Sequence, residues 1–158
     1  MRRERGTLRA QAAGFSLLEM VCALAIVAAL AALALPRLPL ATSRSQLEAR
    51  AVELAALLKA DRAAALRRAV PVATELDAPS GRIRSGAGGR ALRMPSDVRM
   101  ETVLPQLCNG APAGGRIAFL PSGMSCGGVV RLTRGGTGYE VRVNWLTGGV
   151  EIVPRRAS

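Results

Sequence analysis

One apolar run constrains this chain more than any other feature. Residues 15–35 hold a single charge, Glu19, and are otherwise almost all Ala, Leu, Val, Ile, Met and Cys. As a helix rising about 1.5 Å per residue, roughly 21 residues reach about 30 Å, the thickness of a bilayer core. The run therefore predicts a membrane-spanning helix. A carboxylate inside it costs at least about 2.5–3.5 kcal/mol on insertion scales, so Glu19 is expected to have a function.

The entrance to this run carries a specific motif. A basic segment leads into the sequence Gly-Phe-Ser-Leu-Leu-Glu at residues 14–19. This pattern resembles the type III signal of type IV pilins and type II secretion pseudopilins. The resemblance implies that a prepilin peptidase cleaves between Gly14 and Phe15, that the new amine of Phe15 is N-methylated, and that Glu19 acts in assembly. Residues 1–14 are then a leader peptide, and residues 15–36 a transmembrane helix.

The physical chemistry of Glu19 supports the same roles. Removal of the leader exposes a cationic amine at the start of a membrane helix. In a bundle of parallel helices, that amine can pair with Glu19 of a neighbouring subunit and set the axial register between them. A cleaved secretory signal or a simple anchor would not require a carboxylate at the start of its apolar region.

Charge predicts the orientation of the chain. The four arginines of the leader lie just before the apolar run, at positions Arg2, Arg3, Arg5 and Arg9. The positive-inside rule places them in the cytoplasm, so the rest is expected in the periplasm of a single-pass inner-membrane protein. The chain has 22 basic and 11 acidic residues, and without the leader its formal charge is +8. This excess, almost all arginine, indicates either genomic base composition or an anionic partner.

A second helix is predicted after the apolar run. Pro36 is expected to loosen the helix, and a helical pattern resumes at Ser43, where Ser43 or Thr42 caps the restart. The pattern runs to about residue 69 and ends before Pro71. One face is apolar, with Leu47, Ala51, Leu54 and Leu58. The nearby charged residues are expected to lie mostly elsewhere, namely Arg44, Glu48, Asp61 and Arg62. Residues 37–70 are thus the periplasmic half of one long, interrupted helix.

The remainder of the chain, residues 71–158, reads as β-rich. Short extended runs are separated by Gly, Pro and Ser. The expected strands are 72–76, 81–84, 92–94, 98–103, 117–120, 129–133, 139–144 and 150–153. A hairpin is expected around residues 135–138, and loops at 85–90 and 105–115.

This half carries a second resemblance. The runs 117–119, 121–123, 127–132 and 139–141, with Asn144, Thr147 and Gly148, are similar to the C-terminal domain shared by the minor pseudopilin H of type II secretion and the minor pilin FimT. The resemblance implies an α+β, pilin-like fold, in which a long N-terminal helix with a membrane-spanning first half packs on antiparallel β-sheets.

The implied function is that of a minor pseudopilin near the tip of the pseudopilus, which helps to move folded proteins across the outer membrane. The implied partners are other pseudopilins through their N-terminal helices, the prepilin peptidase, the inner-membrane assembly platform and membrane lipid. A third class of function, a membrane-anchored periplasmic domain with no role in a polymer, remains open.

The cysteines lead to one hypothesis. Cys108 and Cys126 lie in Gly-rich segments of the part expected in the periplasm, a compartment that permits disulfides, so we expect a bond between them. The alternative is two unpaired thiols, because connectivity cannot be derived from sequence. Cys22 lies within the apolar run and is expected to behave as a small apolar side chain.

The sequence contains no pattern that is typical of a catalytic site. The chain has no histidine, which removes the commonest general base and metal ligand. The acidic residues show no paired spacing, and no serine lies in a Gly-x-Ser-x-Gly setting. The glycines at 86–89 lack the Lys-Ser/Thr of a phosphate loop. We therefore expect no enzyme activity, no cofactor and no metal site.

The arginines support an alternative function. Several cluster in sequence or close the chain, namely Arg82, Arg84, Arg90, Arg93, Arg99, Arg155 and Arg156. A basic stripe can bind DNA phosphates through counterion release, and some minor pilins of the FimT kind bind DNA during uptake. Arginines at such spacings are more often a solvated face, and only 3% of residues are aromatic and available to stack on bases. A FimT-like, DNA-binding minor pilin is therefore the second interpretation.

Overall fold

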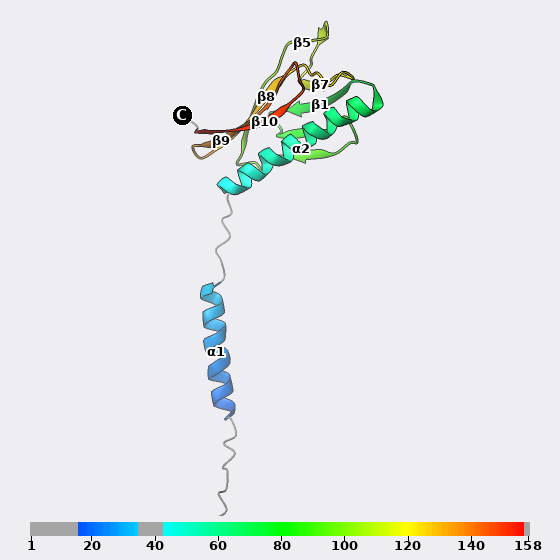
Figure 1. The fold of residues 1–158 in the computed structure, drawn as a ribbon. Coiled ribbons are helices and arrows are strands. Elements are labelled where there is room, and N and C mark those ends of the chain that lie inside the picture. The colour runs from blue at the N-terminus through cyan, green and yellow to red at the C-terminus, as the bar shows by residue number, and fades with distance from the viewer. Residues whose placement is uncertain (1–15, 35–42, 157–158) are drawn as a thin grey trace, which may run out of the picture. The chain divides into compact units, whose positions relative to one another are not determined.

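The computed structural model describes residues 16–34 and 43–156 (Figure 1). The chain divides into two compact units, residues 1–38 and 39–158. The first contains helix α1 (Leu17–Ala34), and the second contains helix α2 (Arg44–Arg68) and all the strands. Pro36, the predicted loosening point, lies outside the described residues.

Helix α1 begins directly after Ser16. The Ser16 hydroxyl accepts a hydrogen bond of 3.2 Å from the backbone N–H of Glu19, which satisfies one of the free donors at the helix start. Every described side chain over residues 17–31 is exposed, although most are apolar. Within the described part of the chain, no helix has both the length and the apolar character needed to cross a membrane.

Helix α2 has the start and end that the sequence predicted. The Ser43 hydroxyl accepts from the Gln46 N–H at 3.3 Å, and the Gln46 side chain accepts from the Ser43 N–H at 3.0 Å. This reciprocal capping box satisfies two donors at once. At the other end Ala69 takes the left-handed conformation, with φ of 53°, and stops the helix before Pro71.

The strands form two four-stranded antiparallel sheets and one short hairpin. The first sheet has the order β3-β2-β1-β7, with bounds β1 (Val72–Asp77), β2 (Arg82–Arg84), β3 (Ala91–Arg93) and β7 (Arg116–Phe119). The second sheet has the order β10-β9-β8-β4, with bounds β4 (Arg99–Val103), β8 (Gly128–Arg134), β9 (Thr137–Val143) and β10 (Val150–Arg156). Strands β8 and β9 form the predicted hairpin, with Gly135 and Gly136 at its turn.

The predicted loop over residues 105–115 is wrong in part. It contains a two-stranded hairpin of β5 (Leu107–Cys108) and β6 (Ala111–Pro112), which Figure 1 shows at one end of the β-rich unit. Asn109 and Gly110 make its turn, both with positive φ. The strands escaped prediction because they are only two residues long and include a proline, which is depleted in strands.

The core lies between α2 and the inner faces of both sheets. Helix α2 contacts β1 and β7 of the first sheet and β8, β9 and β10 of the second. All four residues of its predicted apolar face are buried. Phe119 is the largest fully buried side chain, and the others are mainly aliphatic, as expected for a chain with 3% aromatics.

Asp61 corrects one expectation about α2. Its side chain does not lie away from the packing face but is fully buried within it. The carboxylate accepts hydrogen bonds from the hydroxyls of Thr74 and Ser85 and from the N–H groups of Gly86 and Ala87. These four donors allow a carboxylate to be buried without a cation beside it.

Candidate functional site

Among the site residues predicted in the N-terminal motif, Glu19 is the one that the structure describes. Glu19 lies in the first turn of α1, is exposed, and has a carboxylate at the end of the helix where the dipole favours negative charge. Gly14 and Phe15, the residues predicted for cleavage and methylation, lie outside the described residues. The exposed apolar side chains of α1 surround the helix, and such a helix is normally buried in lipid or in a bundle.

The disulfide hypothesis agrees with the structure, in which Cys108 and Cys126 are bonded with their Cα atoms 5.4 Å apart. The bond ties the β5–β6 hairpin to the segment before β8. The Cys126 N–H also donates to the carbonyl of Ala118 on β7, at 3.0 Å. The cross-link thus joins the hairpin to a segment that is already held against the first sheet.

The structure brings together only part of the predicted arginine stripe. Arg82 and Arg84 of β2 lie on the outer face of the first sheet, away from α2, because Ile83 between them is buried. Arg82 is paired in register with Arg93 of β3, which places three of the predicted residues on one face. The same face carries Glu75, the register partner of Arg84, and Asp77, the partner of Arg82.

Two further predicted arginines lie near this group. The carbonyl of Arg90, before β3, accepts from the Ser85 N–H at 2.8 Å, and Arg99 on β4 lines a pocket with Arg93 and pairs with Glu101 at 3.1 Å. Arg155 is on β10 of the second sheet, apart from β2 and β3, and the side chain of Arg156 lies outside the described residues.

Arg155 belongs to a cluster that the sequence did not reveal. Glu140 lies on the outer face of the second sheet, yet its side chain is only 3% exposed because three arginines cover it. Arg131 of β8 contacts it at 2.8 Å, Arg142 of β9 at 2.6 Å and Arg155 of β10 at 2.5 Å. Three guanidinium groups thus share one carboxylate, and on the same face Glu101 and Glu151 lie opposite Arg131 and Arg142 in register.

The same contacts control the protonation of Glu140. Burial alone would raise its pKa, but hydrogen bonds from Arg142, Arg131 and Arg155 outweigh burial and lower the pKa to about 2. Glu140 is therefore ionised throughout the neutral range. The signals available in sequence were the Arg142 two residues away and the position of Arg131 across the predicted hairpin.

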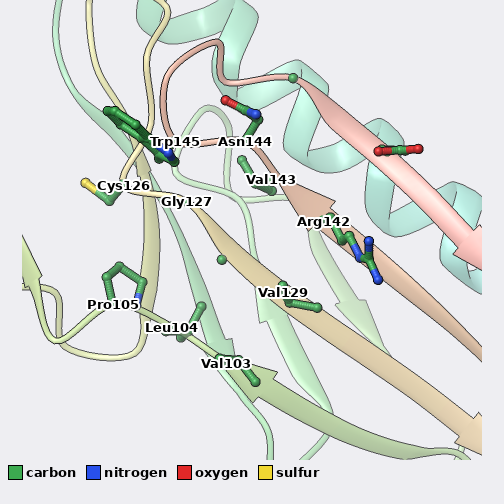
Figure 2. Close-up of a pocket in the computed structure, with 13 residues that line it drawn as sticks. Val103, Leu104, Pro105, Cys126, Gly127, Val129, Arg142, Val143, Asn144 and Trp145 are labelled. Carbon is green, nitrogen blue, oxygen red and sulfur yellow. The ribbon is translucent and has the colours of Figure 1, made fainter.

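A groove adjoins this cluster, at the point where β4 ends and the chain diverges from β8. It has a volume of about 620 Å³ (Figure 2). Its apolar walls include Val103, Leu104, Val129 and the single tryptophan, Trp145. Arg142 and Glu151 supply its charged lining. No motif in the sequence pointed to this groove, because its walls come from three separated segments.

The N-terminal region matches a known family description. Residues 9–35 match the prokaryotic N-terminal methylation motif. Over 149 residues, the chain is 29% identical to the type II secretion system protein H of Xanthomonas campestris pv. campestris. The alignment covers 94% of this chain and 88% of that protein.

Solved structures confirm the predicted pilin-like fold. The minor pseudopilin EpsH from the type 2 secretion system of Vibrio cholerae superposes with a TM-score of 0.55 and 12% identity, over 68% of this chain and 96% of that chain. The type IV minor pilin FimU of Pseudomonas aeruginosa gives a TM-score of 0.55 and 15% identity, over 74% of this chain and 96% of that chain. The resemblance to the pilin-like family is confirmed by the methylation motif and the similarity to protein H, together with this fold.

Proposed function

We propose that this protein is a minor pseudopilin of a type II secretion system, a non-enzymatic structural subunit of the pseudopilus that lies near its tip. One combination carries the proposal: a prepilin motif at residues 14–19 heads a chain that is similar to a protein H over nearly its whole length. The pilin-like fold of the second unit supports the same proposal.

In this proposal, the first unit assembles the filament. The prepilin peptidase cleaves after Gly14, and Phe15 becomes the methylated N-terminus. Its cationic amine pairs with the Glu19 carboxylate of a neighbouring subunit, which fixes the register between parallel helices. The apolar side chains that α1 exposes on all sides pack against lipid before assembly and against other pseudopilin helices after it.

The proposed location follows from the same segment. Residues 15–35 anchor the protein in the inner membrane before assembly, and the leader arginines hold its N-terminus in the cytoplasm. The second unit then lies in the periplasm, where the Cys108–Cys126 disulfide is stable.

Two measurements test this function. The mature protein isolated from membranes should lack residues 1–14 and carry one additional methyl group, measured as intact mass. Deletion of the gene should stop the export of folded proteins and leave type IV pili and DNA uptake unchanged. A chain that keeps its leader, or a deletion that leaves export intact, would contradict the proposal.

The likeness to FimU, a type IV minor pilin, favours one alternative, a minor pilin of a type IV pilus, for which the arginines suggest DNA as a ligand. Arg82, Arg84 and Arg93 on the outer face of the first sheet are the residues for that role. The alternative predicts that the protein binds duplex DNA at low salt and that this binding weakens as salt rises, because counterions compete for the phosphates. An absence of binding at low salt would exclude this alternative.

A further inference from the structure

Hydrogen bonds hold the turn that carries Trp145, although Trp145 is 63% exposed. The Trp145 carbonyl accepts from the Ser125 N–H at 2.9 Å. The side-chain oxygen of Asn144 accepts from the N–H groups of Leu146 and Thr147, at 2.9 and 3.0 Å. An exposed aromatic side chain on a fixed backbone contributes contact area at a small entropic cost, as in the anchors of protein interfaces.

The floor of the groove depends on two glycines. A Cβ added at Gly127 would lie 3.1 Å from the Trp145 Cβ, and one added at Gly128 would lie 2.9 Å from the Leu104 Cδ2. Both glycines have positive φ, which other residues rarely adopt. The two glycines therefore let Trp145 and the side chain of Leu104 pack directly on this segment, without room for a Cβ. The disulfide at Cys126, which also lines the groove, holds this segment in place.

The charge beside the groove indicates what kind of partner fits. Arg142 lines the groove, and its side chain is 50% exposed. Its Nε and Nη2 atoms bond Glu140, and among the described residues no hydrogen bond reaches its Nη1. Arg131 and Arg155 bind the same carboxylate, and Glu101 and Glu151, which lie opposite Arg131 and Arg142 in register, offset the remaining charge of this face. The attraction for an anionic group therefore comes from the outward Nη1 of Arg142, with which a carboxylate from a partner would pair.

We propose that the Trp145 groove and the adjoining Glu140 cluster form a docking site for a segment of another protein, in which an apolar side chain is flanked by carboxylates. The apolar side chain enters between Trp145 and Val103, and a flanking carboxylate binds Arg142. This inference goes beyond the proposed function, since it concerns a surface that neither cleavage nor Glu19 uses.

Two other occupants fit less well. A second copy of this chain would bring a formal charge of +8 per mature subunit toward Arg142. Duplex DNA would lay a continuous run of phosphates over a face that also carries the carboxylates of Glu101, Glu140 and Glu151. A protein segment can place single carboxylates opposite the arginines and avoid these acids.

The single tryptophan reports directly on this site. The full-length mature chain in lipid nanodiscs is titrated with the peptide Asp-Glu-Leu-Leu-Glu-Asp while Trp145 emission is recorded. We expect a blue shift, because the leucines shield the indole from water, and an affinity that falls with added salt. The amide peptide Asn-Gln-Leu-Leu-Gln-Asn is expected to bind about tenfold more weakly.

Matched variants separate the docking site from general charge. Arg142→Gln should weaken the acidic peptide about tenfold, whereas Glu151→Gln, which removes a repelling carboxylate, should strengthen it about threefold. Arg93→Gln on the first sheet is the control and should change nothing.

Several results would overturn the proposal. They are no change in emission at millimolar peptide, equal binding of the amide peptide, equal effects of Arg142→Gln and Arg93→Gln, or displacement of the peptide by duplex DNA. A chain that is processed at Phe15 and supports export, but whose Trp145 does not respond, would overturn the docking site alone. The proposed function would then stand.

Discussion

The Thr74 hydroxyl on β1 donates a hydrogen bond of 2.5 Å to the carboxylate of Asp61 on α2, and both side chains are fully buried. The same carboxylate also accepts from Ser85 and from the backbone of the turn that follows it. One acid therefore joins the long helix, the central strand of the first sheet and a glycine-rich loop. The predicted loop at residues 85–90 is thus anchored by Asp61.

Replacing Asp61 should destabilise the second unit strongly. In Asp61→Ala, two hydroxyls and two N–H groups lose their acceptor inside the protein, and each unsatisfied donor costs about 1–3 kcal/mol. We expect the free energy of unfolding to fall by about 3 kcal/mol or more, measured by denaturant titration followed by circular dichroism. The control is Glu53→Ala, which breaks a half-exposed pair with Arg50 and should cost no more than about 1 kcal/mol. Equal losses in the two variants would show that the buried hydrogen bonds of Asp61 stabilise the fold no more than the half-exposed pair of Glu53 and Arg50 does.

The Glu140 cluster allows a second stability test. Glu140→Gln removes the charge that holds Arg131, Arg142 and Arg155 together, so three cations are left close to one another. Because these arginines are partly exposed and regain water, we expect a loss of about 2 kcal/mol, smaller than for a fully buried pair. Thermal unfolding of the two proteins measures this loss of stability. Glu101→Gln, which breaks only the exposed pair with Arg99, should have a much smaller effect, and the reverse order would contradict the assignment.

The low pKa of Glu140 predicts how stability depends on pH. The pKa is about 2 in the folded protein against an ordinary value of 4.5. The unfolded chain therefore binds the proton first as pH falls, so the contribution of Glu140 is fully present above pH 4.5 and is lost as pH falls toward 2. Unfolding titrations from pH 6 to pH 3 should show a shallower decline in Glu140→Gln than in the native sequence. Parallel declines would mean that other carboxylates account for the acid sensitivity.

The disulfide should stabilise the second unit and order the groove. Its two cysteines are 18 residues apart, and closing a loop of that size contributes about 3 kcal/mol in the chain-entropy model. The double variant Cys108→Ser, Cys126→Ser should therefore unfold at a lower temperature, and reductant should lower the transition of the native sequence but not that of the variant. Cys22→Ser is the matched control, since Cys22 takes no part in the bond. Two freely labelled thiols at positions 108 and 126 without reductant would refute the bond.

The sequence predicted features whose causes are local. The apolar face from Leu47 to Leu58, the Ser43 cap and the Gly135–Gly136 hairpin turn each depend on neighbours within a few residues, and all are present. The prediction that Asp61 lies away from the packing face was wrong. It followed from the charge of the side chain, although Asp61 lies three residues after Leu58 and continues the buried stripe. Its partners come from β1 and the following loop, and such contacts appear only once the sheet has formed.

The groove and the Glu140 cluster depend even more on contacts between distant segments, which form only when the chain folds. Arg155 reaches Glu140 across a strand pairing, and Trp145 lines one groove with Val103 and Leu104, which follow one another at the end of β4. Residue types alone gave no reason to group these side chains. Of the predicted arginines, Arg155 lies on the second sheet, whereas Arg82 and Arg93 lie together on the first.

The role of Glu19 is the central claim, and its most direct test is incorporation of Glu19→Ala into the pseudopilus. Epitope-tagged native and Glu19→Ala chains are expressed with the other pseudopilins, and the fraction of each that cross-links into sheared filaments is measured. The account predicts that Glu19→Ala is cleaved between Gly14 and Phe15 like the native chain but is almost absent from filaments. Incorporation of Glu19→Ala at the native level would contradict it.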